Sequence, residues 1–134
     1  MLRISVHTFT TLLLAVCIGV SVSPPAATAT ASQCPVGYFC VWTDSPFSGH
    51  FAYFAMGASN LTKFKDSIFN NKITDVWNRT ANPFCLYNAL DLRYGGDPRN
   101  TRRVIYPGFK GYLGTYNDVT SSLYRHPPAC PDVK

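Results

Sequence analysis

Residues 39–49 read Phe39-Cys40-Val41-Trp42-Thr43-Asp44-Ser45-Pro46-Phe47-Ser48-Gly49, an apolar run followed by a polar turn, an aromatic residue and a glycine. The apolar run predicts a β-strand, and the Asp, Ser and Pro residues predict the turn that ends it. A glycine at this point permits a positive φ angle, so the hairpin can fold over while Trp42 and Phe47 pack across it. The stretch therefore predicts a folded hairpin in a β domain.

The same arrangement occurs again 45 to 47 residues further along the chain. A repeat of this length is one supersecondary unit that cannot bury its apolar face alone, so two units are expected to close on each other. The matching pairs are Phe39–Trp42 with Phe84–Tyr87, Phe47–Gly49 with Tyr94–Gly96, and Asn70–Trp77 with Asn117–Tyr124.

Six β-branched or aromatic runs, separated by clusters of Gly, Pro, Asn and Asp, predict strands. A short helical turn is expected at Phe64 to Phe69 in the first connection. This spacing predicts an all-β antiparallel sandwich with Greek-key connections. The predicted strands are Tyr38–Thr43, Phe51–Met56, Ile73–Asn78, Phe84–Tyr87, Arg103–Tyr106 and Val119–Arg125.

The composition of the 134-residue chain agrees with one small β domain. Its seven acidic residues are all Asp, and residues that favour helices are scarce, which makes a helix bundle improbable. Ser48-Gly49-His50 places a hydroxyl near an imidazole, but no nucleophile-elbow motif surrounds it. The composition therefore points away from an enzyme.

The N-terminus has the pattern of a secretory signal peptide. Arg3 precedes an apolar stretch from Leu12 to Val22, and small residues from Ala26 to Ala31 offer cleavage sites. Residues 1–31 are expected to be removed, with cleavage after Ala31 or two residues earlier, leaving 32–134 as a single domain. Leu14 to Cys17 resembles a lipoprotein box, but Val precedes the Cys where a small residue is expected. We therefore expect a secreted, extracellular protein with a charge of +4 and no membrane insertion after cleavage.

Four cysteines remain after cleavage, and an even number in a small secreted domain predicts two disulfides. Three pairings are possible. Cys34 and Cys40 bracket a short turn, so a bridge between them is the cheapest closure, and Cys85 with Cys130 would then tie the second half to the C-terminus. A zinc site is the competing interpretation, but the chain contains no Cys-x-x-Cys.

The stretch Trp42 to Gly49 fits the Greek-key signature of the βγ-crystallins, and Tyr87, Tyr94 and Gly96 repeat it with two extra residues. The opening Cys34 to Trp42 further resembles secreted actinobacterial proteins of the Streptomyces metalloproteinase-inhibitor family. The resemblance covers Cys34 to Cys130. It implies a βγ-crystallin-like, two-unit Greek-key β-sandwich stapled by disulfides.

The same resemblance implies that the protein is not an enzyme but an inhibitor of a secreted metallopeptidase, which presents a rigid loop to the peptidase cleft. The alternative is that the loop predicted at Asp97 to Arg103 is an ordinary solvated hairpin loop. The expected partner is a secreted peptidase and not a nucleic acid, and the chain is expected to be a monomer. The candidate inhibitory residues are Asp97, Pro98, Arg99, Asn100, Thr101, Arg102 and Arg103.

Calcium binding is a second implication of the resemblance. Asn117 to Ser122 fits the crystallin calcium motif, and Asn70 to Asp75 fits it in five positions, with Asp75 where Ser is expected. No cofactor is required, and calcium affinity is expected to be weak, with a Kd of about 10⁻⁴–10⁻³ M. Alternatively, these residues only form the turns that open two strands. The implied ligands are Asn71, the Lys72 carbonyl and Thr74, together with Asp118, the Val119 carbonyl and Ser121.

A third hypothesis is a secreted antimicrobial or killer-type protein. The positive charge suits an anionic polymer or a cell-wall glycan. The basic cluster Arg99, Arg102 and Arg103 would be its anchor.

Overall fold

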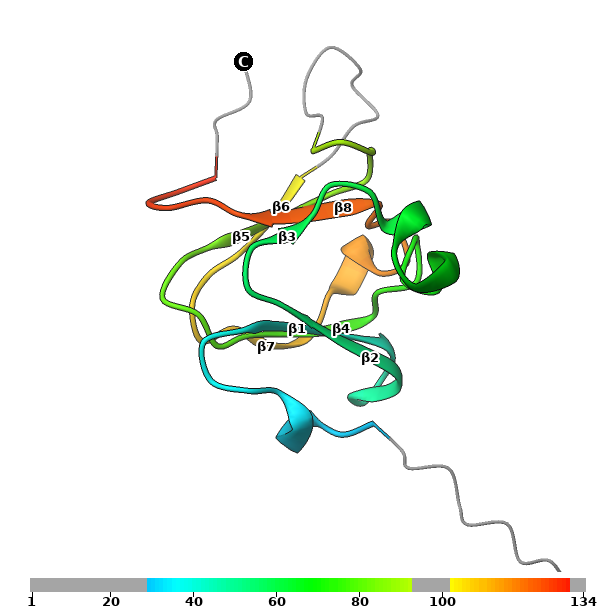
Figure 1. Cartoon of the computed structure of the whole chain (residues 1–134). Helices are drawn as coiled ribbons and strands as arrows, with labels where there is room; N and C mark the ends of the chain where they lie inside the picture. Colours follow the sequence, from blue (N-terminus) through cyan, green and yellow to red (C-terminus); the bar gives the residue numbers. More distant parts are fainter. Residues whose placement is uncertain (1–28, 93–101, 131–134) are drawn as a thin grey trace, which may run out of the picture.

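The computed structural model describes residues 29–92 and 102–130, where eight strands form two four-stranded antiparallel sheets that pack face to face (Figure 1). One sheet has the strand order β2-β1-β4-β7 and the other β3-β8-β5-β6. The predicted all-β, two-unit sandwich is confirmed. The strands are β1 Phe39–Asp44, β2 Ser48–Phe54, β3 Gly57–Ala58, β4 Asp75–Asn78, β5 Phe84–Tyr87, β6 Arg102–Ile105, β7 Lys110–Tyr112 and β8 Ser122–Arg125.

Each half of the chain contributes three strands to one sheet and one strand to the other. β3 comes from the first half but pairs with β8, and β7 comes from the second half but pairs with β4. The two repeats therefore exchange one edge strand each, and neither sheet is built from one repeat alone.

The core between the sheets uses equivalent residues of the two repeats. The rings of Phe39 and Phe84 stack with centroids 4.3 Å apart and an interplanar angle of 11°. Val41 on β1 and Leu86 on β5 are fully buried in the same cluster. Alternate residues of β1 and β5 therefore point to the core, as a strand period of two requires.

The folded hairpin between β1 and β2 has the predicted form. The rings of Trp42 and Phe47 meet edge to face at 5.2 Å, and Gly49 has a φ of 72°. The backbone N–H of Phe47 donates to Oδ2 of Asp75 on β4 at 2.7 Å. A buried carboxylate from a neighbouring strand thus fastens the hairpin to the sheet.

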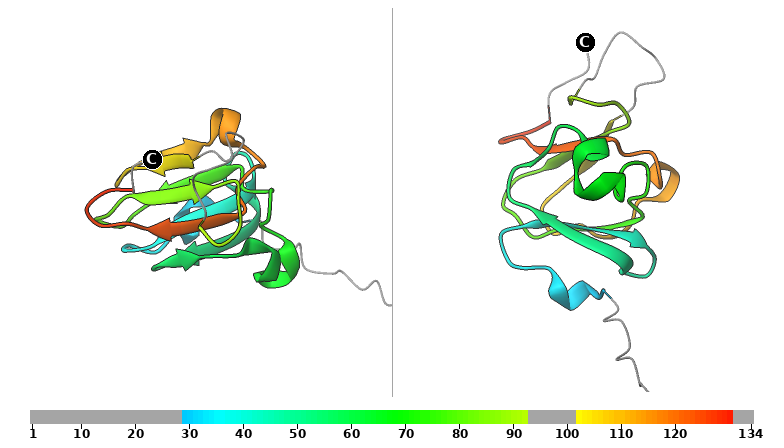
Figure 2. Two further views of the ribbon diagram at one scale, coloured as in Figure 1. Left: turned by 90° about the horizontal axis from the view of Figure 1, so that it is seen from above. Right: turned by 45° about the vertical axis from the view of Figure 1, so that its right-hand side comes forward.

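Of the 3₁₀ turns in the described ranges, η2, η3 and η4 lie at one end of the sandwich, whereas η1 lies outside the sheet of β1 (Figure 2). The helical turn expected at Phe64 to Phe69 is η3, whose three residues all have positive φ angles of 43° to 66°. None of the helical segments in the described ranges is long or apolar enough to cross a membrane. The turns are η1 Ala31–Gln33, η2 Leu61–Lys63, η3 Lys65–Ser67 and η4 Gly114–Tyr116.

Both predicted disulfides are present. Cys34 bonds to Cys40 and Cys85 bonds to Cys130, each pair with its Cα atoms 5.8 Å apart. The second bridge attaches the C-terminal segment to β5, the strand that pairs with β6.

Candidate functional site

Most of the predicted inhibitory loop, from Asp97 to Thr101, lies outside the described residues. Its last two members, Arg102 and Arg103, belong to strand β6, where they pair with Tyr87 and Leu86 of β5. Arg103 is exposed and Arg102 is half-buried. The C-terminal base of the loop is therefore a regular strand rather than a hairpin loop.

The N-terminal approach to this loop is also held in place. Ser122 on β8 donates its hydroxyl to the Ala89 carbonyl at 2.6 Å and accepts the Leu92 N–H at 3.2 Å. The N–H of Asp91 donates to the Ser59 carbonyl. Ser122 and Asp75 therefore have equivalent roles in the two units. Each accepts a hydrogen bond from a backbone N–H of the hairpin in its own unit, that of Leu92 or that of Phe47.

The charge of Arg102 on β6 acts on the pKa values of two residues in a small aromatic cluster. The cluster consists of Tyr87, Tyr124 and His126, and its two tyrosines lie on other strands of the same sheet. The Tyr87 hydroxyl lies 3.3 Å from Nε2 of His126, and the rings of Tyr124 and His126 meet edge to face. Burial raises the pKa of Tyr87, and the positive charge of Arg102 partly offsets this. Burial, together with the same charge, lowers the pKa of His126. His126 is therefore held towards its neutral form in the folded protein.

The two calcium-type motifs cross each other at one end of the sandwich, directly after η3 and η4 (Figure 1). The N–H of Asn71 donates to the Thr120 carbonyl at 2.9 Å, and the N–H of Asp118 donates to the Ile73 carbonyl at 3.2 Å. Asn71 and Asp118 both have left-handed φ angles, 51° and 57°, which Asn and Asp tolerate well. The backbone of the two motifs is thus related by an approximate twofold axis.

The predicted ligand side chains are only partly symmetric. Ser121 Oγ donates to Asn71 Oδ1 at 2.9 Å, so two predicted ligands from opposite motifs meet. Thr74 Oγ1, at the equivalent position, instead donates to the Thr43 carbonyl at 2.7 Å. Asp118 Oδ2 accepts from Asn117 Nδ2. One predicted amide–hydroxyl pair is therefore in contact, and the other is not.

Several polar atoms beside these motifs have no hydrogen-bond partner within the described ranges. They are the buried Oδ1 atoms of Asn70, Asp75 and Asn117, and Oγ1 of Thr120. Lys72 is exposed at the surface, as are Asn71 and Asp118. The described residues contain no cluster of three or more His, Cys, Asp or Glu side chains that could hold a metal ion, so a cation here would depend on the single carboxylate of Asp118 together with amide, hydroxyl and carbonyl oxygens.

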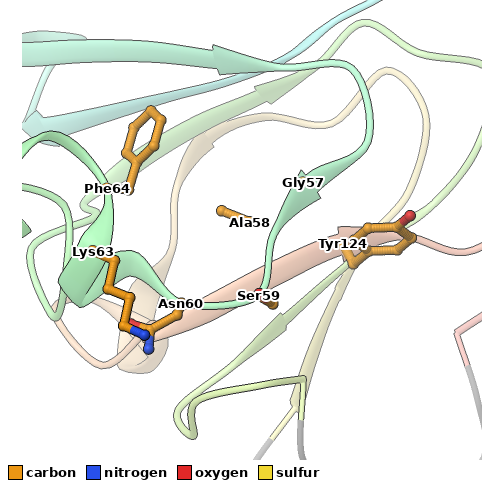
Figure 3. A pocket seen from close by; sticks show the side chains of 7 residues that line it. All are labelled: Gly57, Ala58, Ser59, Asn60, Lys63, Phe64 and Tyr124. Atoms are coloured by element: carbon orange, nitrogen blue, oxygen red, sulfur yellow. The ribbon is translucent and has the colours of Figure 1, made fainter.

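A shallow hollow of about 440 Å³ lies at the edge strand β3, a place that the sequence did not indicate. Figure 3 shows Tyr124 at one end of it and Lys63 with Phe64 at the other. None of the predicted site residues lines it. The lining residues are Gly57, Ala58, Ser59, Asn60, Lys63, Phe64 and Tyr124.

The turn closed by the Cys34–Cys40 bridge is a further feature that the sequence analysis used only for its cysteines. Of the residues that precede it, Ala29 is buried in the same cluster as Cys40 and Trp42. The Thr30 N–H donates to Gln33 Oε1 at 3.1 Å. The segment before β1 is therefore built into the fold.

Residues 27–101 match the sequence profile of peptidase inhibitor family I36. No curated protein matches the sequence significantly.

Several solved structures have a similar fold. A βγ-crystallin from Ciona intestinalis is 15% identical, with a TM-score of 0.54, and covers 67% of this chain and 100% of its own. A βγ-crystallin domain from Clostridium beijerinckii is 13% identical, with a TM-score of 0.53, and covers 66% and 97%. The N-terminal domain of Protein S is 19% identical, with a TM-score of 0.53, and covers 69% and 99%. At these identities the likeness establishes the βγ-crystallin-like fold alone.

Proposed function

Because this chain belongs to peptidase inhibitor family I36, we propose that it inhibits a secreted metallopeptidase by presenting a rigid loop to the cleft of that enzyme. The family consists of inhibitors, so the chain is not an enzyme and its partner is a peptidase. The observation that carries the proposal is the family match, which extends through Thr101 and so includes Asp97 to Thr101.

The frame around the proposed loop supports this role. β6 pairs with β5 along four residues, and the Cys85–Cys130 bridge fixes β5 to the C-terminal segment. On the other side, Leu92 is tied to Ser122. A loop whose two bases are already ordered loses less conformational entropy on docking, which favours tight binding.

An inhibition panel tests the proposal. The purified protein should inhibit a thermolysin-type metallopeptidase at micromolar concentration or below, and should inhibit serine peptidases less. Arg99→Ala combined with Arg103→Ala should weaken inhibition if the predicted loop enters the cleft. Lys63→Ala, which lies at the β3 hollow, is the matched control for lost positive charge. If about ten micromolar protein leaves the activity of every metallopeptidase in the panel unchanged, the proposal is refuted for that class of peptidase.

Export is part of the proposal. Buried disulfides are typical of proteins that fold in an oxidising compartment. Both cleavage positions remove the buried Ala29, but cleavage after Ala29 would keep the hydrogen bonds of Thr30 with Gln33, whereas cleavage after Ala31 would remove them. We therefore favour Thr30 as the first residue of the secreted protein. The intact mass of the protein from culture medium decides between the two positions.

Calcium binding is the second candidate function. The observation that favours it is the twofold arrangement of the two motifs, in which Ser121 and Asn71 meet beside oxygen atoms that have no other partner. Hard oxygen donors suit Ca²⁺, but Asp118 is the only carboxylate among the proposed ligands, so the Kd should be about 10⁻⁴–10⁻³ M.

Calorimetry and thermal unfolding with added Ca²⁺ test this candidate. Millimolar Ca²⁺ should raise the melting temperature, and Asp118→Ala should abolish the increase. Asp66→Ala, on η3, removes an exposed carboxylate outside the ligand set and is the control. An equal increase in both variants would mean that the ion binds elsewhere.

A further inference from the structure

The disulfide-closed turn before β1 carries the most exposed large apolar side chain of the described residues. Val36 is 74% exposed, although the two cysteines that close the turn are buried. The flanking residues are Pro35 and Gly37, and Tyr38 follows. The turn is therefore a short, uncharged projection with an aliphatic side chain at its tip.

The base of this turn is held by several independent contacts. The bridge joins Cys34 to Cys40 across a sequence separation of 6. The Gly37 N–H donates to the Arg79 carbonyl, and the Arg79 N–H donates to the Tyr38 carbonyl, both at 3.0 Å. The guanidinium of Arg79 donates to the Cys34 carbonyl and stacks on the Trp77 ring at 4.6 Å. These contacts fix the turn before any partner arrives.

The tip itself is left open for intermolecular contacts. Within the described ranges, neither the N–H nor the carbonyl of Val36 makes a hydrogen bond. Tyr38 lies beside it and meets the exposed Tyr53 of β2 edge to face at 5.1 Å. The turn thus combines a free backbone unit, an apolar side chain and an aromatic surface next to it. A peptidase binds the same combination in a substrate, by backbone hydrogen bonds and a pocket for one side chain.

Resting on the proposed function, we propose that the Cys34–Cys40 turn is a second, separate peptidase-contacting element. It inserts Val36 into an apolar specificity pocket of a different peptidase molecule from the one that the Asp97 to Arg103 loop enters. The partner is a secreted peptidase that selects aliphatic side chains, since Pro35 to Tyr38 carry no charge that a pocket for Lys, Arg or Asp would recognise. Rigidity before binding contributes to affinity because little ordering remains to be done.

The position of the turn separates it from the other candidate loop. In Figure 1 the segment that joins η1 to β1 lies below the sheet of β1 and β4, whereas β6 lies in the opposite sheet at the top. Substitutions in the turn therefore leave the base of the Asp97 to Arg103 loop intact, and the two elements can be tested separately.

The test measures inhibition constants of the whole secreted protein against a thermolysin-type metallopeptidase and a peptidase that selects aliphatic side chains. Val36→Asp should weaken inhibition about tenfold to a hundredfold, the usual effect of losing a central anchor. Val36→Leu should retain inhibition within a few-fold. The matched control is Tyr112→Ala, which removes another exposed apolar side chain, on β7. Circular dichroism checks that all variants are folded.

The outcomes separate this inference from the proposed function. If Val36→Asp inhibits as well as wild type while Arg99→Ala with Arg103→Ala does not, the turn is not a contact and the inference is overturned, although the protein remains an inhibitor. If Tyr112→Ala weakens inhibition as much as Val36→Asp does, the effect is not specific to the turn and the inference is again overturned. If the wild-type protein inhibits no peptidase, the proposed function itself fails and this inference fails with it.

Discussion

Asp75 is a buried carboxylate that makes a single side-chain hydrogen bond among the described residues. Its Oδ2 accepts the Phe47 N–H, while its Oδ1 has no partner among the described residues. Sequence alone marked Asp75 as a departure from the crystallin motif, where Ser is expected. It could not show that the carboxylate fastens the hairpin, because that contact joins residues 28 positions apart.

We predict that Asp75→Ala lowers the free energy of unfolding by about 1–3 kcal/mol, since the Phe47 N–H would lose its partner at a part-buried site. Asp75→Ser should be less harmful, because Ser122 makes the equivalent contact in the other repeat and a hydroxyl is cheaper to bury than a carboxylate. Urea unfolding measures both. A serine variant less stable than the alanine variant would contradict this account.

His126 gives the protein a pH dependence with a defined sign. Burial first, and then the charge of Arg102, lower its pKa in the folded state below the value of about 6.5 for an unperturbed histidine. As the pH falls through 6.5, the unfolded chain binds the proton more readily than the folded one, so stability decreases; above that pH the histidine contributes nothing.

We therefore expect the free energy of unfolding to be lower at pH 5 than at pH 7.5, and the difference to be smaller in His126→Gln. Glutamine can still hydrogen bond to the Tyr87 hydroxyl but does not titrate. Urea unfolding at the two pH values measures this effect. Equal pH dependence in wild type and variant would assign the effect to other groups.

At the scale of the elements, the sequence predicted six strands, and all six are present. Phe84–Tyr87 has the predicted ends, and the other five strands have shifted ends. It did not predict β3 and β7. Both are short, contain glycine and lie at sheet edges, so they lack the β-branched or alternating pattern that marks a strand. They are strands because the edge of the other repeat offers hydrogen-bond partners, and that information is not local.

The glycine of β3 shows how closely this exchanged strand approaches its partner. Gly57 has a φ of 129°, and an added Cβ would lie 2.6 Å from the Tyr124 Cα and closer still to the Leu123 carbonyl. We predict that Gly57→Ala lowers stability by about 2–5 kcal/mol through strain and overpacking.

Gly108→Ala is the matched control for that substitution. Gly108 also has a positive φ, 83°, but no atom lies within 4 Å of an added Cβ. Its alanine variant should lose only about 1–2 kcal/mol from backbone strain. Thermal unfolding compares the stability of the two alanine variants. Equal losses of stability would show that the close β3–β8 contact adds nothing to the cost of backbone strain.

For the candidate sites, the sequence located both disulfides correctly, whereas the calcium ligands that it implied stay a prediction. The different hydrogen-bond partners of Thr74 and Ser121 were not predictable, because Thr74 donates its hydroxyl to the Thr43 carbonyl of another strand. The exposure of Val36 was equally invisible, since a valine in a sequence is more often buried than exposed. Both depend on contacts between distant segments.

For the whole molecule, the two disulfides should differ in their contribution to stability. In the loop-entropy picture, the Cys85–Cys130 bridge, with a sequence separation of 45, contributes about 4 kcal/mol, and the Cys34–Cys40 bridge, with a separation of 6, about 2 kcal/mol. We predict this order for Cys85→Ser with Cys130→Ser against Cys34→Ser with Cys40→Ser. Guanidinium unfolding of the two double variants measures it, and the reverse order would mean that local packing outweighs chain entropy.

The exchange of β3 and β7 between the two sheets has a consequence for fragments of the chain. A fragment that holds a single repeat lacks the strand that completes its own sheet, so the edge of that sheet stays open to a strand from a second fragment. The two repeats therefore need each other to complete both sheets, although one hairpin is fastened by an aspartate and the other by a serine.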